Sequence, residues 1–252
     1  MAANPFDLTG RVAVVTGANT GIGQAIALAL GQAGAAVAAV GRSPMDETEA
    51  LVRQAGARFH AIRADLGSIA PVKAIVAETL STFGGLDILV NNAGIIRRTD
   101  AIDFSEEDWD AVMDVNLKTA FFLSQAAARH MIGQGSGKII NIASLLSFQG
   151  GIRVPSYTAS KSGLAGITRL LACEWAGKGI NVNAIAPGYF ITNNTTALRE
   201  DPDRSAAILA RVPAGRWGDP ADLGGAAVFL ASSASDYVHG AVIPVDGGWM
   251  AR

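Results

Sequence analysis

The chain has 252 residues, of which 50% are hydrophobic and 17% are charged. This length suits one large α/β domain, and this composition excludes a disordered chain. The formal net charge of −2 leaves no general basic surface for binding nucleic acid.

The sequence shows no targeting segment and no pattern of cysteines or histidines that predicts a disulfide or a metal site. The first nine residues lack the basic start and apolar core of a signal peptide, and no apolar run reaches the roughly 18 residues of a membrane span. Cys173 is the only cysteine and lies in a helical pattern, so we expect a buried structural thiol. The histidines His60, His130 and His239 share no ligand spacing, so we predict no metal site. These features favour a cytoplasmic protein with no membrane partner.

Short apolar runs alternate with longer helical patterns along nearly the whole chain. The runs predicted as strands are Val12–Thr16, Ala36–Val40, Phe59–Ala64, Leu86–Asn91, Lys138–Ala143, Ile180–Ile185 and Ala241–Val245. The helical patterns are Ile22–Gln32, Glu47–Gln54, Ile69–Phe83, Trp109–Met131, Pro155–Lys178 and Asp222–Ala231. Because parallel strands need right-handed crossover helices, this order predicts an α/β fold: one doubly wound, parallel, seven-stranded sheet with helices on both faces.

One stretch, residues 188–218, breaks this rhythm. It is rich in Thr, Asn, Arg and Pro and contains no clear strand. Ligands of doubly wound sheets bind beyond the carboxyl ends of the strands, so a long insertion there is a candidate substrate lid. No linker or repeat divides the rest, and residues 1–252 are predicted to form a single dinucleotide-binding and catalytic domain.

Three glycines with the spacing Gly-x-x-x-Gly-x-Gly join the first strand to the first helix. Gly17, Gly21 and Gly23 allow positive φ angles and a close backbone approach. The free amides and the dipole of the helix N-terminus can then hold a pyrophosphate. Such a triplet also fits an ordinary tight turn, so the prediction of dinucleotide binding depends on the motifs that follow.

Tyr157 and Lys161 are four residues apart on a predicted helix and therefore share one face. A free tyrosine, with a pKa of about 10, is a poor base at neutral pH. A nearby cation lowers that pKa, so we expect Lys161 to activate Tyr157. Without further evidence, this spacing is typical of two ordinary surface residues on a helix. Ser144, at a strand end just upstream, favours alcohol oxidation.

Together the motifs resemble the short-chain dehydrogenase/reductase family nearly end to end. The matching residues are the glycine loop, Asp65-Leu66, Asn91-Asn92-Ala93-Gly94, Asp114-Val115-Asn116, Ser144, Tyr157-Thr158-Ala159-Ser160-Lys161, Pro187-Gly188 and Thr192. The resemblance implies a Rossmann fold and an NAD(P)-dependent oxidoreductase. It implies coenzyme contacts at Gly17, Asn19, Thr20, Gly21, Ile22, Gly23, Asp65, Leu66, Asn92, Ala93, Gly94, Tyr157, Lys161, Pro187, Gly188 and Thr192.

The resemblance also implies a catalytic group of four residues. Tyr157 would be the acid/base, and Ser144 would hydrogen-bond the substrate oxygen. Lys161 would also hold the nicotinamide ribose. Asn116 would bind a water that links Lys161 to solvent, although an asparagine inside a helix is often only a structural hydrogen-bonder.

The coenzyme itself stays open between NAD and NADP. An NAD enzyme usually has a carboxylate at the end of the second strand, where this chain has Gly41. Arg42 can instead pair with a 2′-phosphate, or it can be a solvent-exposed charge.

Arginines gather around the predicted pocket at positions 97, 98, 153 and 216. The guanidinium fork matches a carboxylate, although each arginine can equally be a surface charge. The predicted substrate contacts are Ser144, Tyr157, Arg153, Arg97 and Gln149. For Arg153 the alternative is an internal ion pair that braces its loop.

Five segments resemble one subfamily, the 2-dehydro-3-deoxy-D-gluconate 5-dehydrogenases, also named 2-deoxy-D-gluconate 3-dehydrogenases. They are residues 95–98, 144–157, 186–189, 213–218 and 245–252. The resemblance implies a keto-deoxy sugar-acid substrate, a homotetramer and, more often, NAD. The small-residue face of Ala165, Gly166, Thr168 and Ala172 fits packing between subunits or core packing equally. Alternatives are gluconate 5-dehydrogenase, 3-oxoacyl carrier-protein reductase and a non-catalytic dinucleotide-sensing regulator.

Overall fold

The computed structural model describes residues 4–252, and within them one parallel sheet carries the fold. Its strand order is β3-β2-β1-β4-β5-β6-β7. The strands are β1 Val12–Thr16, β2 Ala36–Gly41, β3 Phe59–Arg63, β4 Ile88–Asn91, β5 Gly137–Ile142, β6 Ile180–Pro187 and β7 Val242–Val245. The predicted doubly wound, seven-stranded sheet is confirmed.

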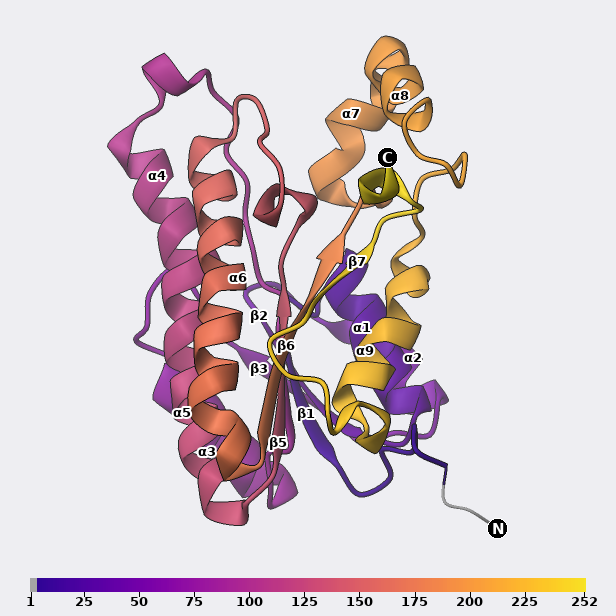
Figure 1. The fold of residues 1–252 in the computed structure, drawn as a ribbon. Helices are drawn as coiled ribbons and strands as arrows, with labels where there is room; N and C mark the ends of the chain where they lie inside the picture. The colour runs from indigo at the N-terminus through magenta and orange to yellow at the C-terminus, as the bar shows by residue number, and fades with distance from the viewer. Residues whose placement is uncertain (1–3) are drawn as a thin grey trace.

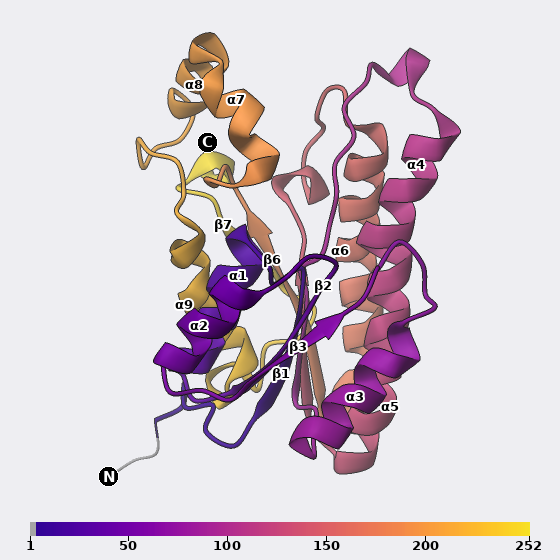
Figure 2. The ribbon, with the colours of Figure 1, turned by 180° about the vertical axis from the view of Figure 1, so that it is seen from behind.

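Helices cover both faces of the sheet. Figure 1 shows α1, α2 and α9 on one side and α3, α4, α5 and α6 on the other, and Figure 2 shows the same layers from behind. The helices are α1 Gly21–Gln32, α2 Asp46–Gln54, α3 Val72–Phe83, α4 Glu106–Met113, α5 Ala120–Gln134, α6 Pro155–Trp175, α7 Thr196–Glu200, α8 Pro202–Leu209 and α9 Gly224–Ala231. The short helices α7 and α8 stand beyond the carboxyl end of β6, with the C-terminus beside them.

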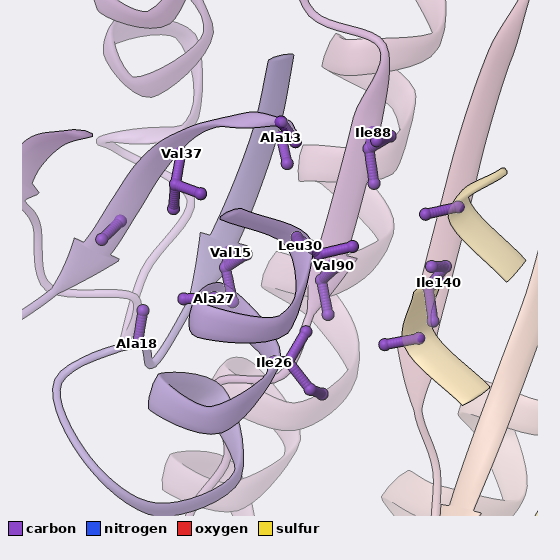
Figure 3. Close-up of a cluster of buried hydrophobic side chains, with 14 of the residues drawn as sticks. Ala13, Val15, Ala18, Ile26, Ala27, Leu30, Val37, Ile88, Val90 and Ile140 are labelled. Atoms are coloured by element: carbon purple, nitrogen blue, oxygen red, sulfur yellow. The ribbon is translucent and has the colours of Figure 1, made fainter. Parts of the chain in front are cut away.

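Alternate residues of each strand enter two separate cores. Val15 of β1 packs with Ile26 and Leu30 of α1 in the first core, part of which Figure 3 shows. Val14, one residue earlier, faces the second core with Leu123 of α5. Because helices bury both faces, all five residues of β1 are buried, as expected for a parallel sheet. The carboxyl edge of the sheet is left as the open edge for a ligand.

The predicted long helix between β4 and β5 has a different internal structure. It begins earlier, at Glu106, because the side chain of Ser105 accepts a hydrogen bond from the N–H of Asp108 and caps α4. The six residues Asp114–Thr119 then form a π-helix before α5 continues to Gln134. A π-helical turn is rare and frequently lies at a functional site. Hydrophobic periodicity cannot detect it.

Two other helix starts differ from the prediction. α3 begins at Val72 rather than Ile69, directly after Pro71. α9 begins at Gly224, because Pro220–Leu223 form a separate 3-10 turn capped by Asp219. Residues 188–218 contain no strand, as expected, but they carry α7 and α8, which the polar composition concealed.

Cys173 was expected to be buried and is instead exposed on α6. The residues of the small-residue face on the same helix differ in exposure. Ala165, Thr168 and Ala172 are buried in this chain, whereas Gly166 is exposed. Core packing therefore accounts for three of the four small residues. Within residues 4–252, no helix combines the length and the apolar character needed to cross a membrane.

Candidate active site

The glycine loop has the geometry of a pyrophosphate cradle. Gly17 and Gly21 have φ angles of +64° and +57°, which disfavour any side chain. A Cβ on Gly23 would lie 2.1 Å from the carbonyl oxygen of Gly17, so only glycine lets α1 approach the loop. Thr20, the N-cap of α1, makes no capping hydrogen bond with its side chain, and the first turn holds no acid. The helix N-terminus therefore fits an anionic group such as a dinucleotide phosphate.

The turn after β4 is fastened to this loop. The hydroxyl of Thr16 accepts hydrogen bonds from the N–H groups of Asn92 at 2.9 Å and Ala93 at 3.0 Å. The amide of Asn92 donates to the carbonyl oxygens of Thr16 at 2.8 Å and Gly17 at 3.1 Å. The side chains of Thr16 and Asn92 thus join two loops at the centre of the sheet edge into one unit. It lies where doubly wound folds hold a ligand.

Thr192 meets this unit from the other half of the sheet, since a Cβ on Gly21 would lie 3.6 Å from Cγ2 of Thr192, in the segment after β6. Gly188 packs instead against the segment after β7, where its Cβ would lie 2.7 Å from Cα of Asp246. Pro187 ends β6 beside it.

Arginines lie at the ends of β2 and β3. Gly41 ends β2, and the side-chain oxygen of Asn19 would lie 3.5 Å from a Cβ there. Arg42 is exposed, and Arg63 at the end of β3 donates to its carbonyl oxygen at 3.3 Å. Asp65 accepts the N–H of Gly67 at 2.9 Å, and Leu66 is buried in the second core. Arg63 is a neighbour that the sequence analysis did not single out.

Tyr157, Lys161 and Ser144 come together where the carboxyl end of β5 meets the first turns of α6. Ser144 is buried, and its hydroxyl accepts the N–H of Leu146 at 3.2 Å. The ammonium of Lys161 donates to the carbonyl oxygen of Ile142 at 2.6 Å and lies 5.6 Å from the ring centre of Tyr157. The predicted trio therefore shares one site.

The pKa values differ from the simple expectation. Burial raises the pKa of Tyr157, while the neighbouring Ser144 hydroxyl and the charge of Arg98 act to lower it. Burial lowers the pKa of Lys161 to about 8. We expected Lys161 to lower the pKa of Tyr157. The net direction in the protein alone is upward, because desolvation outweighs the opposing effects, and the expected effect of Lys161 itself stays a prediction.

Asn116 lies within the π-helix and is almost fully buried. Its side-chain oxygen accepts the N–H of Ile95 at 2.8 Å, and its amide donates to the Ile95 carbonyl oxygen at 2.9 Å. A Cβ on Gly94 would lie 3.3 Å from Oδ1 of Asn116 and 3.7 Å from Nζ of Lys161. The side chain thus fixes the strand-end turn against the lysine.

A cavity of about 800 Å³ opens beside the predicted catalytic side chains. Ser144 and Tyr157 line it, together with Gln149, Tyr189 and Trp249. Its charged lining residues are Arg98, Arg153, Arg204, Arg211 and Asp201.

The predicted arginines have different surroundings. Arg153 lines the cavity and pairs with Asp100 at 3.1 Å, and its positive φ of 63° marks a strained loop. Arg97 does not line the cavity and pairs with Asp108 at 3.0 Å. Arg216 also lies outside it, pairing with Asp222. The structure instead adds two arginines, at 204 and 211, from the segment that carried no recognisable pattern.

Comparisons with known proteins agree with this geometry. A family profile described as enoyl-(acyl carrier protein) reductase matches residues 17–250. A 2-dehydro-3-deoxy-D-gluconate 5-dehydrogenase of Escherichia coli K12 is 61% identical over all of both chains. The chain belongs to the short-chain dehydrogenase/reductase family. It is an NAD(P)-dependent oxidoreductase, and the predicted family and enzyme class are confirmed.

Solved structures of this family share the whole fold. A protein of Agrobacterium tumefaciens, provisionally named a 2-deoxy-D-gluconate 3-dehydrogenase and crystallised with NADP, is 60% identical with a TM-score of 0.93, covering 99% of this chain and 100% of its own. A gluconate 5-dehydrogenase of Burkholderia cenocepacia, in complex with NADP and tartrate, is 42% identical with a TM-score of 0.94 and full coverage of both chains.

Proposed function

We propose that this enzyme interconverts a hydroxyl and a ketone on a keto-deoxy sugar acid of the 2-dehydro-3-deoxy-D-gluconate type. The observation that carries the proposal is the charge of the cavity beside Ser144 and Tyr157, where four arginines face one acid. Guanidinium groups match a carboxylate. The identity of 61% to a dehydrogenase of that substrate supports the same chemistry.

Tyr157 is the proposed acid/base. During oxidation its oxygen takes the proton of the substrate hydroxyl, and during reduction it returns that proton to the carbonyl oxygen. The Ser144 hydroxyl, next to Tyr157, donates to the same substrate oxygen and orients it. The nicotinamide, when bound, accepts or supplies the hydride. Because the pKa of Tyr157 is raised in the protein alone, phenolate formation needs added positive charge.

Lys161 and Asn116 have supporting roles in this proposal. Lys161 holds the nicotinamide ribose and adds the positive charge next to Tyr157. Its pKa of about 8 keeps it mostly protonated at neutral pH while letting it release a proton in mildly basic solution. Asn116, fixed to Ile95, positions the turn around Lys161 and the water that links it to solvent.

The coenzyme contacts predicted for the glycine loop and for the strand-end residues Asp65, Leu66, Asn92, Ala93, Gly94, Pro187, Gly188 and Thr192 fit this reaction. For the 2′ position we propose NADP. Arg42 and Arg63 lie at neighbouring strand ends, and no carboxylate ends β2. Two relatives named above were crystallised with NADP. The arginine pair would bind the 2′-phosphate.

Residues 188–218 act, in this proposal, as a substrate lid on a single domain that spans the chain. Near its start the lid contacts the glycine loop through Thr192, and its helix α8 lines the cavity. Its hydrophobic base consists of Ile208 and Val212 packed on Leu145 and Trp249.

We also propose a cytoplasmic homotetramer. The exposed surface of α6 has the small and apolar residues that helix packing between copies uses: Gly166, Leu170 at 52% exposure, and Cys173. A chain with one cysteine forms no internal disulfide, which suits a reducing compartment. Light scattering of the purified protein measures the assembly directly.

A substrate panel tests the proposed activity. The enzyme is offered 2-dehydro-3-deoxy-D-gluconate, D-gluconate, a neutral hexitol and a 3-oxoacyl thioester, with the matching redox form of each coenzyme. We expect the largest kcat/KM for the keto-deoxy acid. A larger value for the thioester would overturn the proposal, and no turnover of any compound would favour a dinucleotide-sensing regulator.

A further inference from the structure

The chain neutralises only part of the positive charge that it directs into the cavity. Arg153 is matched by Asp100, and Arg98 donates to the backbone carbonyl of Asn194 at 2.9 Å. Arg204 and Arg211 make no ion pair among residues 4–252. Both belong to the lid, one on α8 and one just after it. Arg98, Arg204 and Arg211 therefore line the cavity without a carboxylate partner in the described chain, and the lid carries two of these three cations.

Asp201 is the one acid that lines the cavity within the described chain, and it does not compensate them. Its Oδ1 accepts hydrogen bonds from the N–H groups of Asp203 at 3.1 Å and Arg204 at 3.0 Å. This carboxylate caps the N-terminus of α8, where a negative charge stabilises the helix. Its contacts serve the backbone of the lid rather than the guanidinium groups.

The two lid arginines line the same cavity as Tyr189, whose ring lies 4.8 Å from the ring of Trp249. Burial raises the pKa of Tyr189, and the charges of Arg204 and Arg211 both oppose that rise. Tyr189 directly follows Pro187 and Gly188 at the end of β6 and lines the same cavity. Like charges that share one neighbourhood repel each other, and an anion between them removes that repulsion.

Arg211 is held in a fixed orientation. Its guanidinium carbon lies 4.0 Å from the ring centre of Trp249, which is 5% exposed. The indole N–H of Trp249 donates to Oε1 of Gln149 at 3.2 Å, in the loop that begins at Ser144. Stacking fixes the plane of a guanidinium and leaves its N–H edge free for a bidentate contact. The orientation of Arg211 is thus tied to the catalytic loop.

Arg98 has the opposite character, because its charge acts on Tyr157. In a six-carbon acid several carbon–carbon bonds separate the carboxylate from the carbon that reacts. A carboxylate beside Tyr157 would displace the reacting hydroxyl. The acid group must therefore lie at a different wall of the cavity, and the lid arginines with Tyr189 supply one.

We propose that Arg204 and Arg211 of the lid, with the Tyr189 hydroxyl, form the site that binds the carboxylate of the substrate. The inference rests on the proposed sugar-acid chemistry and specifies which residues read the acid. It assigns Arg153 to the alternative role considered for it, a brace between its loop and Asp100. The lid thereby becomes the specificity element for acids over neutral polyols.

The test compares Arg211→Gln and Arg204→Gln with two control variants from the same cavity, Arg153→Gln and Arg98→Gln. We expect each lid variant to lower kcat/KM for the sugar acid by about 10- to 100-fold, mainly through KM, as a lost charged hydrogen bond does. The dissociation constant of NADP should not change. Arg98→Gln should instead lower kcat and shift the pH profile, because its charge acts on Tyr157.

Binding of tartrate separates this inference from the activity itself. Calorimetry with NADP present measures tartrate affinity without turnover. Binding to the parent enzyme that weakens at least about tenfold in Arg211→Gln supports the acid site even if the substrate panel fails. Unchanged tartrate affinity in both lid variants, no binding to the parent enzyme, or an equal loss in Arg153→Gln overturns it.

Discussion

The two halves of the active site are built in opposite ways. On the coenzyme side, two short side chains hold the backbone segments together: Thr16 and Asn92 bond the loop around Gly17 and Gly23 to the turn after β4, and a Cβ on either glycine would clash. On the substrate side, long side chains from three distant segments surround an 800 Å³ cavity. The first half can accept one ligand shape. The second can change its substrate by exchanging arginines while the fold stays the same.

Chemistry occurs where the two halves meet, and the largest effect is expected there. Tyr157→Phe keeps the buried ring and removes the hydroxyl that carries the proton. We predict that kcat falls by at least about 10²-fold, the lower end of general acid–base contributions, with NADP affinity retained. Steady-state kinetics measure this, with Tyr237→Phe, a fully exposed tyrosine, as the matched control. Near-normal turnover would remove Tyr157 from the reaction.

The rigidity of the coenzyme half is tested by Gly23→Ala. The new Cβ would lie 2.1 Å from a backbone oxygen, so the loop must move. We expect a loss of about 1–3 kcal/mol in the free energy of unfolding, typical of overpacking, and weaker NADP binding.

Gly133→Ala, at an exposed position of α5, is the matched control, because its Cβ meets nothing within 4 Å. At that position alanine should raise stability by about 0.5–1 kcal/mol, the difference in helix propensity. Urea unfolding measures both variants. Equal stabilities of Gly23→Ala and the parent protein would mean that the loop is not closely packed.

Lys161 lies where the two halves meet, and its burial makes the free energy of unfolding depend on pH. Its pKa is about 8 in the folded protein and 10.5 when exposed. Below pH 8 the amine is charged in both states, and burial of that charge destabilises the fold. Between the two values the unfolded chain binds more protons, so stability rises with pH.

Relative to Lys161→Met, the parent protein should gain about 2 kcal/mol of unfolding free energy between pH 7 and 9.5, from a pKa difference near 2.5 units. Urea unfolding of the protein without coenzyme at both pH values gives the difference. A constant difference between the two proteins would show that Lys161 is not desolvated.

The sequence predicted the local backbone of the coenzyme half, whereas its individual coenzyme contacts stay predictions. Glycines that need positive φ, and a Tyr-x-x-x-Lys pair on one helical face, are local patterns, and the structure has them where the patterns put them. The π-helix around Asn116 was not predictable, because it changes hydrogen-bond register without changing hydrophobic periodicity.

For the substrate half, the sequence predicted the type of residue but not which positions line the cavity. Arginines were correctly expected around the pocket, but Arg97 is drawn to Asp108 and Arg216 to Asp222. Arg204 and Arg211 enter the cavity only because α8, a helix with a polar sequence, folds over it. Which arginine finds an acid is decided by tertiary contacts. Cys173 was misjudged for a related reason, since the exposed face of α6 mixes apolar Leu170 and Cys173 with charged Arg169 and Glu174.

The separation of the two halves is tested most directly by a crossed measurement on Arg42→Ala and Arg211→Gln. For each variant, KM is determined for NADP, for NAD and for the sugar acid. Arg42→Ala should raise KM for NADP by about tenfold, the lower end of a charged hydrogen bond, and leave NAD and the acid unchanged. Arg211→Gln should raise KM for the acid alone. If either variant alters all three constants equally, the coenzyme and the acid are not read by separate parts of the site, and this account is contradicted.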